Sequence, residues 1–417
     1  MQSNEIEQLK QAFASTIIST TKQIPKFLTH DLIKNFSLAV PHVEYLTSEF
    51  DEWLSDEDLI QIFVGLARFY EGQGDYNQSI NWRERCLSTV REKLGEANSN
   101  IITSLNNLAE SYRLQGKYEE AEIFLLQAFE VVKNSSEQEI LDVLTNRINL
   151  GLLYIHQGRF YEAESLHQEA LELSQKVSGD IQLYKAQVLN NLAGLYNLQA
   201  RYQEAESLYC QAIEIRKQLL GENHPDFAQT LGNLAGLYYD KGHFNEAKFL
   251  FLQALEIYKH FFWETHPCVL RILNNLAVIH KQQGHFDEAA LLYQKALELR
   301  KKLLGENHPD VAISLNNLAT LHRSQGNYSE AEPLYQEALR LKRQLLGEDH
   351  PDVAISLNNL AFLYEFQCRY VESETCYRQA LEISERQLGV DHPNTQTFCK
   401  NLEMLRSHKS RTLKPET

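Results

Sequence analysis

The sequence has few prolines, very little methionine and no long apolar run. Of its 417 residues, nine are proline and two are methionine. No uninterrupted apolar stretch approaches the roughly 18 to 20 residues that cross a bilayer, and residues 1–30 interleave charged with polar side chains. We therefore expect no membrane segment and no signal peptide.

Cysteine is also sparse, and its spacing excludes two kinds of site. There is no Cys-x-x-Cys pair, so the sequence predicts neither a zinc site nor a redox dithiol. Unpaired cysteines at scattered positions are typical of a reducing cytoplasm, which is the location that we expect. The six residues are Cys86, Cys210, Cys268, Cys368, Cys376 and Cys399.

Positive charge is in short supply. The chain has 40 Lys and Arg against 56 Asp and Glu, a formal net charge of −16, and it contains no basic run. A nucleic-acid-binding face needs clustered cations, so we expect no nucleic-acid partner. Hydrophobic residues at 43% and charged residues at 23% are ordinary for a folded protein.

The common catalytic motifs are missing as well. The sequence has no Gly-x-x-x-x-Gly-Lys-Ser/Thr phosphate loop, no Gly-x-Gly-x-x-Gly, no His-Glu-x-x-His and no Gly-x-Ser-x-Gly. We therefore predict a non-enzymatic protein, with no catalytic residues, metal, cofactor or small-molecule substrate.

The sequence does contain a regular internal repeat. One asparagine recurs every 42 residues without insertion, and leucine follows it each time. Such a constant period predicts a repeat architecture in which each unit packs against its neighbours. The residues of this asparagine ladder are Asn107, Asn149, Asn191, Asn233, Asn275, Asn317, Asn359 and Asn401.

Each unit is predicted to be a helical hairpin. Between residues 312 and 353, apolar residues recur at helical spacing on either side of a Gly326-Asn327 break. Small residues at Ala319, Ala331 and Ala338 let the two helices approach closely. Gly347 is predicted to supply a left-handed C-terminal cap, and Pro351 to open the next helix.

These motifs resemble a known family. Asn-Asn-Leu-Ala, Gln-Gly, Tyr/Phe-x-Glu-Ala-Glu and Ala-Leu-Glu resemble the tetratricopeptide repeat, and the 42-residue period with Leu-Gly-Glu-Asn-His-Pro-Asp resembles its kinesin light chain-like variant. Residues 31–76 also resemble the entry to the C-terminal arrays of bacterial STAND signalling proteins. The resemblance implies an all-α, right-handed α-solenoid of about eight hairpins.

The expected organisation follows from the period. Residues 1–59 would form an N-terminal helical cap, 60–395 the array, 396–408 a C-terminal capping helix and 409–417 a polar tail. The hairpins would start near residues 60, 102, 144, 186, 228, 270, 312 and 354.

Several recurring residues have a structural and a chemical interpretation. The five His-Pro pairs are one repeat apart, too far to share a metal ion, and are better explained as helix N-caps. The tyrosines at the register of Tyr112 are expected to pack in the core, and Cys86 and Cys368 to act as small packing residues. Trp263 replaces a capping glycine and predicts either an altered turn or an exposed anchor.

The asparagine ladder leaves two alternatives open. Asparagine is a mediocre helix former, so its regular recurrence inside helices needs a reason. Its amides could tie adjacent hairpins together. The family resemblance implies instead that Asn107, Asn149, Asn191, Asn233, Asn275, Asn317 and Asn359 bind the backbone of an extended peptide.

Charged residues near this ladder are close to balance, unlike the whole chain. The cations are Arg68, Arg113, Arg271, Lys281 and Arg323, and the anions are Glu71, Glu110, Asp240 and Glu365. We therefore expect Arg113, Arg271, Lys281 and Arg323 to belong to the peptide-binding surface. Three of them, Arg271, Lys281 and Arg323, could receive an acidic or C-terminal carboxylate.

The sequence thus predicts a cytoplasmic scaffold that binds a partner protein or an extended peptide. The alternative is a sensor or regulatory module of a STAND-type ATPase on a separate chain.

Overall fold

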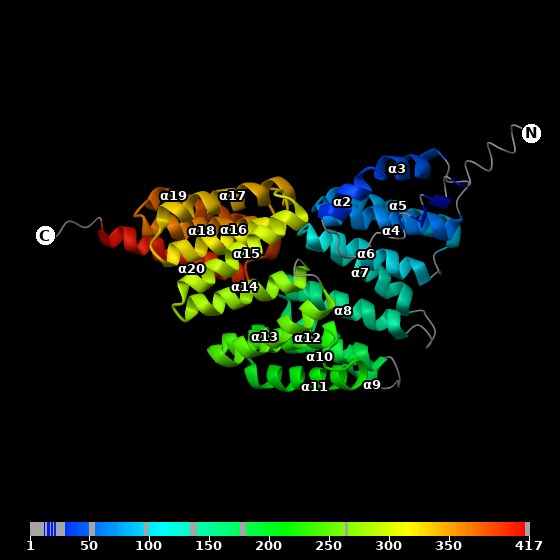
Figure 1. Ribbon diagram of the computed structural model, residues 1–417, viewed down its shortest axis with the longest axis horizontal. Helices are drawn as coiled ribbons and strands as arrows, with labels where there is room; N and C mark the ends of the chain where they lie inside the picture. The colour runs from blue at the N-terminus through cyan, green and yellow to red at the C-terminus, as the bar shows by residue number, and fades with distance from the viewer. Residues whose placement is uncertain are drawn as a thin grey trace, which may run out of the picture. The chain divides into compact units, whose positions relative to one another are not determined.

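The computed structural model describes residues 30–49, 55–95, 99–133, 140–175, 181–262 and 266–412, with six further positions between 12 and 21. The described residues are all-α, with nineteen helices (Figure 1). The helices follow one another in pairs, which confirms the predicted solenoid of helical hairpins. Part of the expected N-terminal cap, residues 413–417 of the expected tail, and Trp263 lie outside the described residues.

The chain divides into two compact parts, each described by itself. The first comprises residues 1–136 with 302–308, and the second residues 137–301 with 309–417. The first part contains α2 (His30–Ser37), α3 (Val40–Glu49), α4 (Asp56–Gln73), α5 (Tyr76–Leu94), α6 (Ser99–Leu114) and α7 (Tyr118–Lys133).

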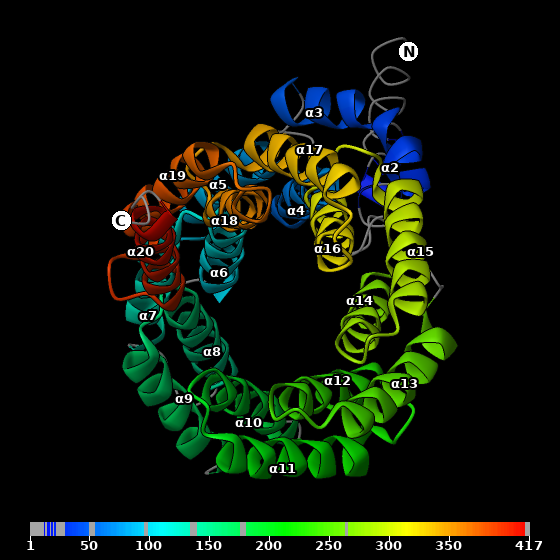
Figure 2. The same cartoon turned by 90° about the vertical axis from the view of Figure 1, so that its left-hand side faces the viewer.

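The second part holds the remaining hairpins. In chain order it contains α8 (Ile140–His156), α9 (Phe160–Gln175), α10 (Ile181–Leu198), α11 (Tyr202–Leu220), α12 (Pro225–Asp240), α13 (Phe244–Phe261), α14 (Pro267–Gln282), α15 (Phe286–Leu304, the end of which belongs to the first part), α16 (Pro309–Ser324), α17 (Tyr328–Leu346), α18 (Pro351–Phe366), α19 (Tyr370–Leu388) and α20 (Pro393–Thr412). Within this part, α8, α10, α12, α14, α16 and α18 follow the inner side of a curve, and their partners follow the outer side (Figure 2).

Small residues allow the two helices of a hairpin to pack closely. Ala319 on α16 and Ala331 and Ala338 on α17 are completely buried. Tyr335 fills the space between them with only 1% of its surface exposed. This is the arrangement expected when alanines bring helix backbones together and a large side chain fills the flank.

A histidine caps the N-terminus of α12, α14, α18 and α20. The Nδ1 atoms of His224, His266, His350 and His392 each accept a hydrogen bond from the backbone N–H two residues later, at 3.0 to 3.2 Å. The proline that follows has no N–H to lose at this position. The N-cap interpretation is confirmed for these four residues.

Two details differ from the sequence predictions. Gly347 has φ 96° and ψ 160°, an extended conformation at positive φ rather than the left-handed helical one. Cys368 is exposed at a turn, where it adopts φ 59°, so its predicted packing role is wrong. Cys86 is buried, as expected.

Buried cations join successive hairpins, a feature that the sequence analysis missed. Arg216 and Lys342 occupy the same register of the second helix of their hairpins, α11 and α17. Arg216 donates to the backbone carbonyl of Asp226 at 2.6 Å, and Lys342 donates to that of Asp352 at 3.2 Å. Arg300, also at this register, donates to Ser314 at 2.5 Å. Burial lowers the pKa of all three groups, so their partners compensate a real desolvation cost.

None of the helices in the described ranges combines the length and the apolar character that a membrane crossing requires.

Candidate functional site

The asparagine ladder divides into bonded and unbonded members. Asn233 donates to Asn190 at 2.9 Å, Asn359 to Asn316 at 3.2 Å and Asn401 to Asn358 at 2.9 Å. In each case the acceptor is the asparagine one position before the ladder residue of the preceding hairpin. These three ladder residues therefore link neighbouring hairpins, which supports the structural interpretation at their positions.

Among the ladder residues of the second part, two lack that acceptor because the preceding hairpin carries another residue there. The position is Ile148 for Asn191 and Gly232 for Asn275. The Nδ2 group of Asn191 is buried without a partner. Asn275 makes no side-chain hydrogen bond to any described residue, and it is half-buried.

For a further ladder residue, Asn317, the acceptor is present but already accepts hydrogen bonds from an arginine. The candidate acceptor is Asn274, and in the amide orientation that its surroundings favour its oxygen accepts from Arg300 at 2.8 and 3.1 Å. No side-chain hydrogen bond from Asn317 to the described chain is formed. Asn107 and Asn149 are half-buried, and their amides are likewise unbonded within the described ranges.

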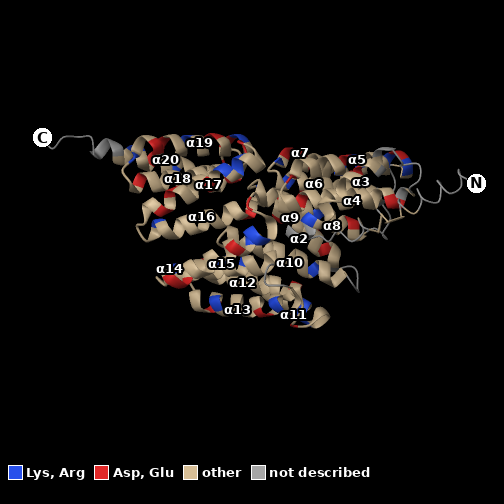
Figure 3. Cartoon of the chain, turned by 45° about the horizontal axis from the view of Figure 1, so that its top comes forward, with Lys and Arg blue, Asp and Glu red and all other residues tan. Residues whose placement is uncertain are grey.

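Most charged groups near the ladder are neutralised by partners. Acidic and basic residues are interspersed over the helices (Figure 3). Arg113 forms an ion pair with Glu110 at 2.7 Å on its own helix. Glu71 turns instead toward α5, where it pairs with the nearly buried Arg83 at 2.7 Å. Arg113 is therefore not a free carboxylate receptor, and Glu71 does not line the predicted surface.

The other two acids are also engaged. Asp240 accepts from Asn197 at 2.7 Å. Glu365 accepts from Tyr377 at 3.2 Å and lies 3.5 Å from His408. The acidic residues expected near the ladder are thus used in contacts within the fold.

In the first part, Arg68 on α4 has no acidic partner among the described residues. In the second part, Lys281 and Arg323 also lack one. They occupy the same register, one repeat apart, near the ends of α14 and α16. Neither forms an ion pair with a residue that the structure describes. Burial lowers the pKa of the Lys281 amine, and the charge of Arg323 lowers it further. Two half-buried like charges that repel each other make a favourable position for an anion.

Aromatic side chains from α18 complete this surface. The Arg323 guanidinium lies 5.2 Å from the ring centre of Phe362 and 5.9 Å from that of Phe366. Phe366 is 56% exposed, so part of its ring is available to a ligand. The sequence analysis missed both residues, although two aromatic residues one helical turn apart were a usable signal.

The structure separates Arg271 from this cluster. Arg271 is exposed near the start of α14 and hydrogen-bonds to Tyr258 of α13. It precedes Lys281 by ten residues, which corresponds to about 15 Å along the helix. We name the remaining set the α14–α18 surface: Asn275, Lys281, Asn317, Arg323, Phe362 and Phe366.

The tyrosines next to the ladder are held by acids of the preceding hairpin. Tyr196 donates to Glu164 at 2.8 Å, and Tyr238 to Glu206 at 2.8 Å. The bond to Glu206 and burial raise the pKa of Tyr238 to about 12. These tyrosines contribute packing and interhairpin bonds.

Within the described ranges, no three His, Cys, Asp or Glu residues come together as metal ligands.

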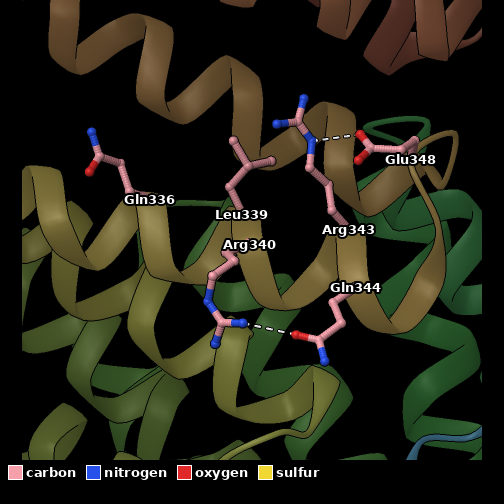
Figure 4. A pocket seen from close by; sticks show the side chains of 6 residues that line it. All are labelled: Gln336, Leu339, Arg340, Arg343, Gln344 and Glu348. Atoms are coloured by element: carbon pink, nitrogen blue, oxygen red, sulfur yellow. Dashed lines mark hydrogen bonds and ion pairs between the residues drawn. The ribbon is translucent and has the colours of Figure 1, made fainter.

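A pocket of about 400 Å³ lies along α17 (Figure 4). Its arginines already have partners: Arg343 pairs with Glu348 at 2.8 Å, and Arg340 pairs with Glu337 at 2.7 Å and donates to Gln344 at 2.8 Å. Because these charges are satisfied and solvent-exposed, this pocket offers an anion less than the α14–α18 surface does.

Comparison with known proteins identifies the repeats. The sequence model of the tetratricopeptide repeat matches residues 58–134, 142–218, 184–260, 268–344, 310–386 and 352–397. No curated protein sequence shows significant similarity to the chain.

Two solved structures with TM-scores above 0.5 share the fold. The apo form of the quorum sensor NprR from B. thuringiensis is 15% identical, with a TM-score of 0.53 over 74% of this chain and 82% of that one. A Rap protein complexed with Competence and Sporulation Factor is 14% identical, with a TM-score of 0.51 over 85% and 99%. BtubC (BKLC) from P. vanneervenii is 24% identical over 55% and 92%, with a TM-score of 0.47.

Proposed function

Because the chain belongs to the tetratricopeptide repeat family, whose members typically bind proteins or peptides, we propose that it is a non-enzymatic scaffold that binds an extended peptide segment. The peptide lies on the α14–α18 surface and places a carboxylate between Lys281 and Arg323. The carboxylate is an acidic side chain or the C-terminal group of the partner. A role beside a separate STAND-type ATPase stays a prediction.

One observation carries this proposal: on two successive first helices, an unbonded ladder amide occurs together with a half-buried cation that has no acidic partner. Asn275 and Lys281 lie on α14, and Asn317 and Arg323 lie on α16. Elsewhere in the second part, Asn233 and Asn359 use their amides to join hairpins. Asn149 and the Nδ2 group of Asn191 are unengaged within the described residues, but their helices carry Ile155 and Asn197 rather than a cation at the register of Lys281. An unengaged amide can donate to and accept from a peptide backbone, whereas an amide already bonded within the fold is less able to do so.

The chemistry of the surface suits a peptide with both a charged and an apolar group. A lysine and an arginine can form charge-assisted hydrogen bonds to a carboxylate. The exposed ring of Phe366 offers an apolar contact beside them. The complex of the Rap protein with its factor is a precedent for this fold holding a ligand.

The proposal is tested with a random peptide array in which every sequence is displayed with a free and with an amidated C-terminus. We expect the wild type to select peptides rich in carboxylates, and a Lys281→Gln/Arg323→Gln double variant to lose at least tenfold in signal on them. Arg340→Gln on α17 is the matched control, since that cation already has an acidic partner. Equal selection by the wild type and the double variant would refute the proposed site.

A further inference from the structure

A turn between two helices of the second part touches a turn far along the chain. Gly158, between α8 and α9, lies against His392 and Pro393, which begin α20. A Cβ atom added to Gly158 would be 2.8 Å from Cδ2 of His392 and 3.4 Å from Cδ of Pro393. The two turns are separated by between five and six repeats, and α20 returns toward α8 (Figure 2).

The contact includes a directional bond. The His392 imidazole accepts from the backbone N–H of Asn394 at 3.1 Å through Nδ1, as the other capping histidines do in their turns. It also hydrogen-bonds to the backbone of His156, and this bond raises the pKa of His392 against the larger, lowering effect of burial. These two bonds fix the orientation of the ring.

Glycine at position 158 is required by this contact rather than by the backbone. The equivalent turn positions of two other hairpins are Ala200 and Cys368, both of which adopt φ 59°. The turn therefore accepts a side chain. At Gly242, Gly284 and Gly326, other members of the same register, an added Cβ would meet nothing within 4 Å. Gly158 alone among the four has a close neighbour at that point.

A contact between distant hairpins has a mechanical consequence. In a repeat array each hairpin contacts only its neighbours, so small rotations at each interface accumulate along the stack. Joining the turn after α8 to the turn before α20 fixes the sum of those rotations. The curvature of the second part then depends on one small contact as well as on its many helix interfaces.

We propose that the contact of His392 with Gly158 and His156 is a latch that holds the second part in a closed curve, and that the array opens when the latch is released. This inference does not depend on the proposed peptide site.

The test compares two variants in which alanine replaces a turn glycine at positive φ. Gly158→Ala places a methyl group where the His392 ring lies, whereas Gly242→Ala adds the same methyl group in open space at φ 79°. We expect small-angle X-ray scattering to give a maximum dimension longer by at least one helix diameter, about 10 Å, for Gly158→Ala and no change for Gly242→Ala. Amides in 153–160 and 389–397 should exchange hydrogen faster in Gly158→Ala alone.

A second variant approaches the latch from its other side. His392→Asn keeps an N-cap acceptor for α20 but removes the ring that rests on Gly158. We expect the same lengthening, with far-UV circular dichroism unchanged. If both His392→Asn and Gly158→Ala have the scattering profile and the exchange rates of the wild type, the latch does not exist. Should Gly158→Ala fail to fold, His392→Asn decides the question.

Discussion

A buried histidine makes the third hairpin sensitive to pH. His167 is completely buried on α9, and neither of its ring nitrogens has a hydrogen-bond partner. It occupies the register of Tyr209, Tyr293 and Tyr335, where other hairpins have an aromatic ring. Burial lowers the pKa of His167 to about 4. The side chain must therefore stay neutral in the folded protein.

We predict that stability falls as the solution becomes acidic because of this residue. Its pKa in the unfolded chain is about 6.5, so below that pH the unfolded state takes up a proton that the folded state does not. The loss begins near pH 6.5 and reaches about 3 kcal/mol by pH 4. Urea titrations at several pH values should show that the free energy of unfolding falls less with decreasing pH in His167→Leu than in the wild type. Leucine is chosen because α7 has Leu125 at this register. Parallel curves for variant and wild type would contradict the assignment.

The glycine facing His167 gives a second prediction. Gly151 on α8 replaces the alanine found at this register in other hairpins, and a Cβ there would lie 2.6 Å from Cε1 of His167. Gly151→Ala should therefore lower the free energy of unfolding by about 1 to 3 kcal/mol. Gly236→Ala on α12 is the control, since its Cβ would meet nothing within 4 Å. We expect that variant to be neutral or to gain about 0.5 to 1 kcal/mol from helix propensity.

At the scale of the helical elements, some residues of the asparagine ladder join hairpins, and others belong to the proposed peptide site. Asn233→Ala removes the bond to Asn190 and should lower the stability by about 0.5 to 1.5 kcal/mol. Asn275→Ala with Asn317→Ala removes two amides that bond to nothing described, so it should leave helicity and melting nearly unchanged while weakening peptide binding. Thermal melts of both variants check this difference. Equal destabilisation by each substitution would show that all ladder residues are structural.

Much of this arrangement was predictable from sequence, because a 42-residue period fixes both the helices and their registers. The hairpins, the histidine caps and the alanine packing follow from local patterns at constant spacing. The division of the ladder was also encoded, since Gly232 and Ile148 stand where the acceptor asparagine is needed. It was missed because it depends on pairing residues from two different repeats.

Other features could not be predicted from the register of single residues. Glu71 is spaced as if it faced the ladder surface, yet the buried Arg83 of the next helix draws it away. Arg216, Arg300 and Lys342 look like ordinary helix cations in the sequence. Their burial depends on where the following helix begins, which is a property of the stacked hairpins.

At the scale of the whole molecule, repetition provides the scaffold and its exceptions provide the candidate functions. The α14–α18 surface occurs where the ladder lacks acceptors and where Lys281 and Arg323 lack acids. The proposed latch occurs at Gly158, a turn glycine that contacts a residue far along the chain. Function in such an array is therefore best sought at positions that depart from the repeat.

The measurement that tests the central claim most directly is a thermodynamic cycle on one selected peptide. The peptide is prepared in two forms, one with the free carboxylate and one with the carboxylate amidated. The dissociation constant of each form is measured for the wild type and for Arg323→Gln. The account predicts that either change alone weakens binding roughly 10- to 100-fold and that making both adds little more, because they remove the same charged contact. Independent, additive losses would show that the carboxylate binds elsewhere and would contradict the account.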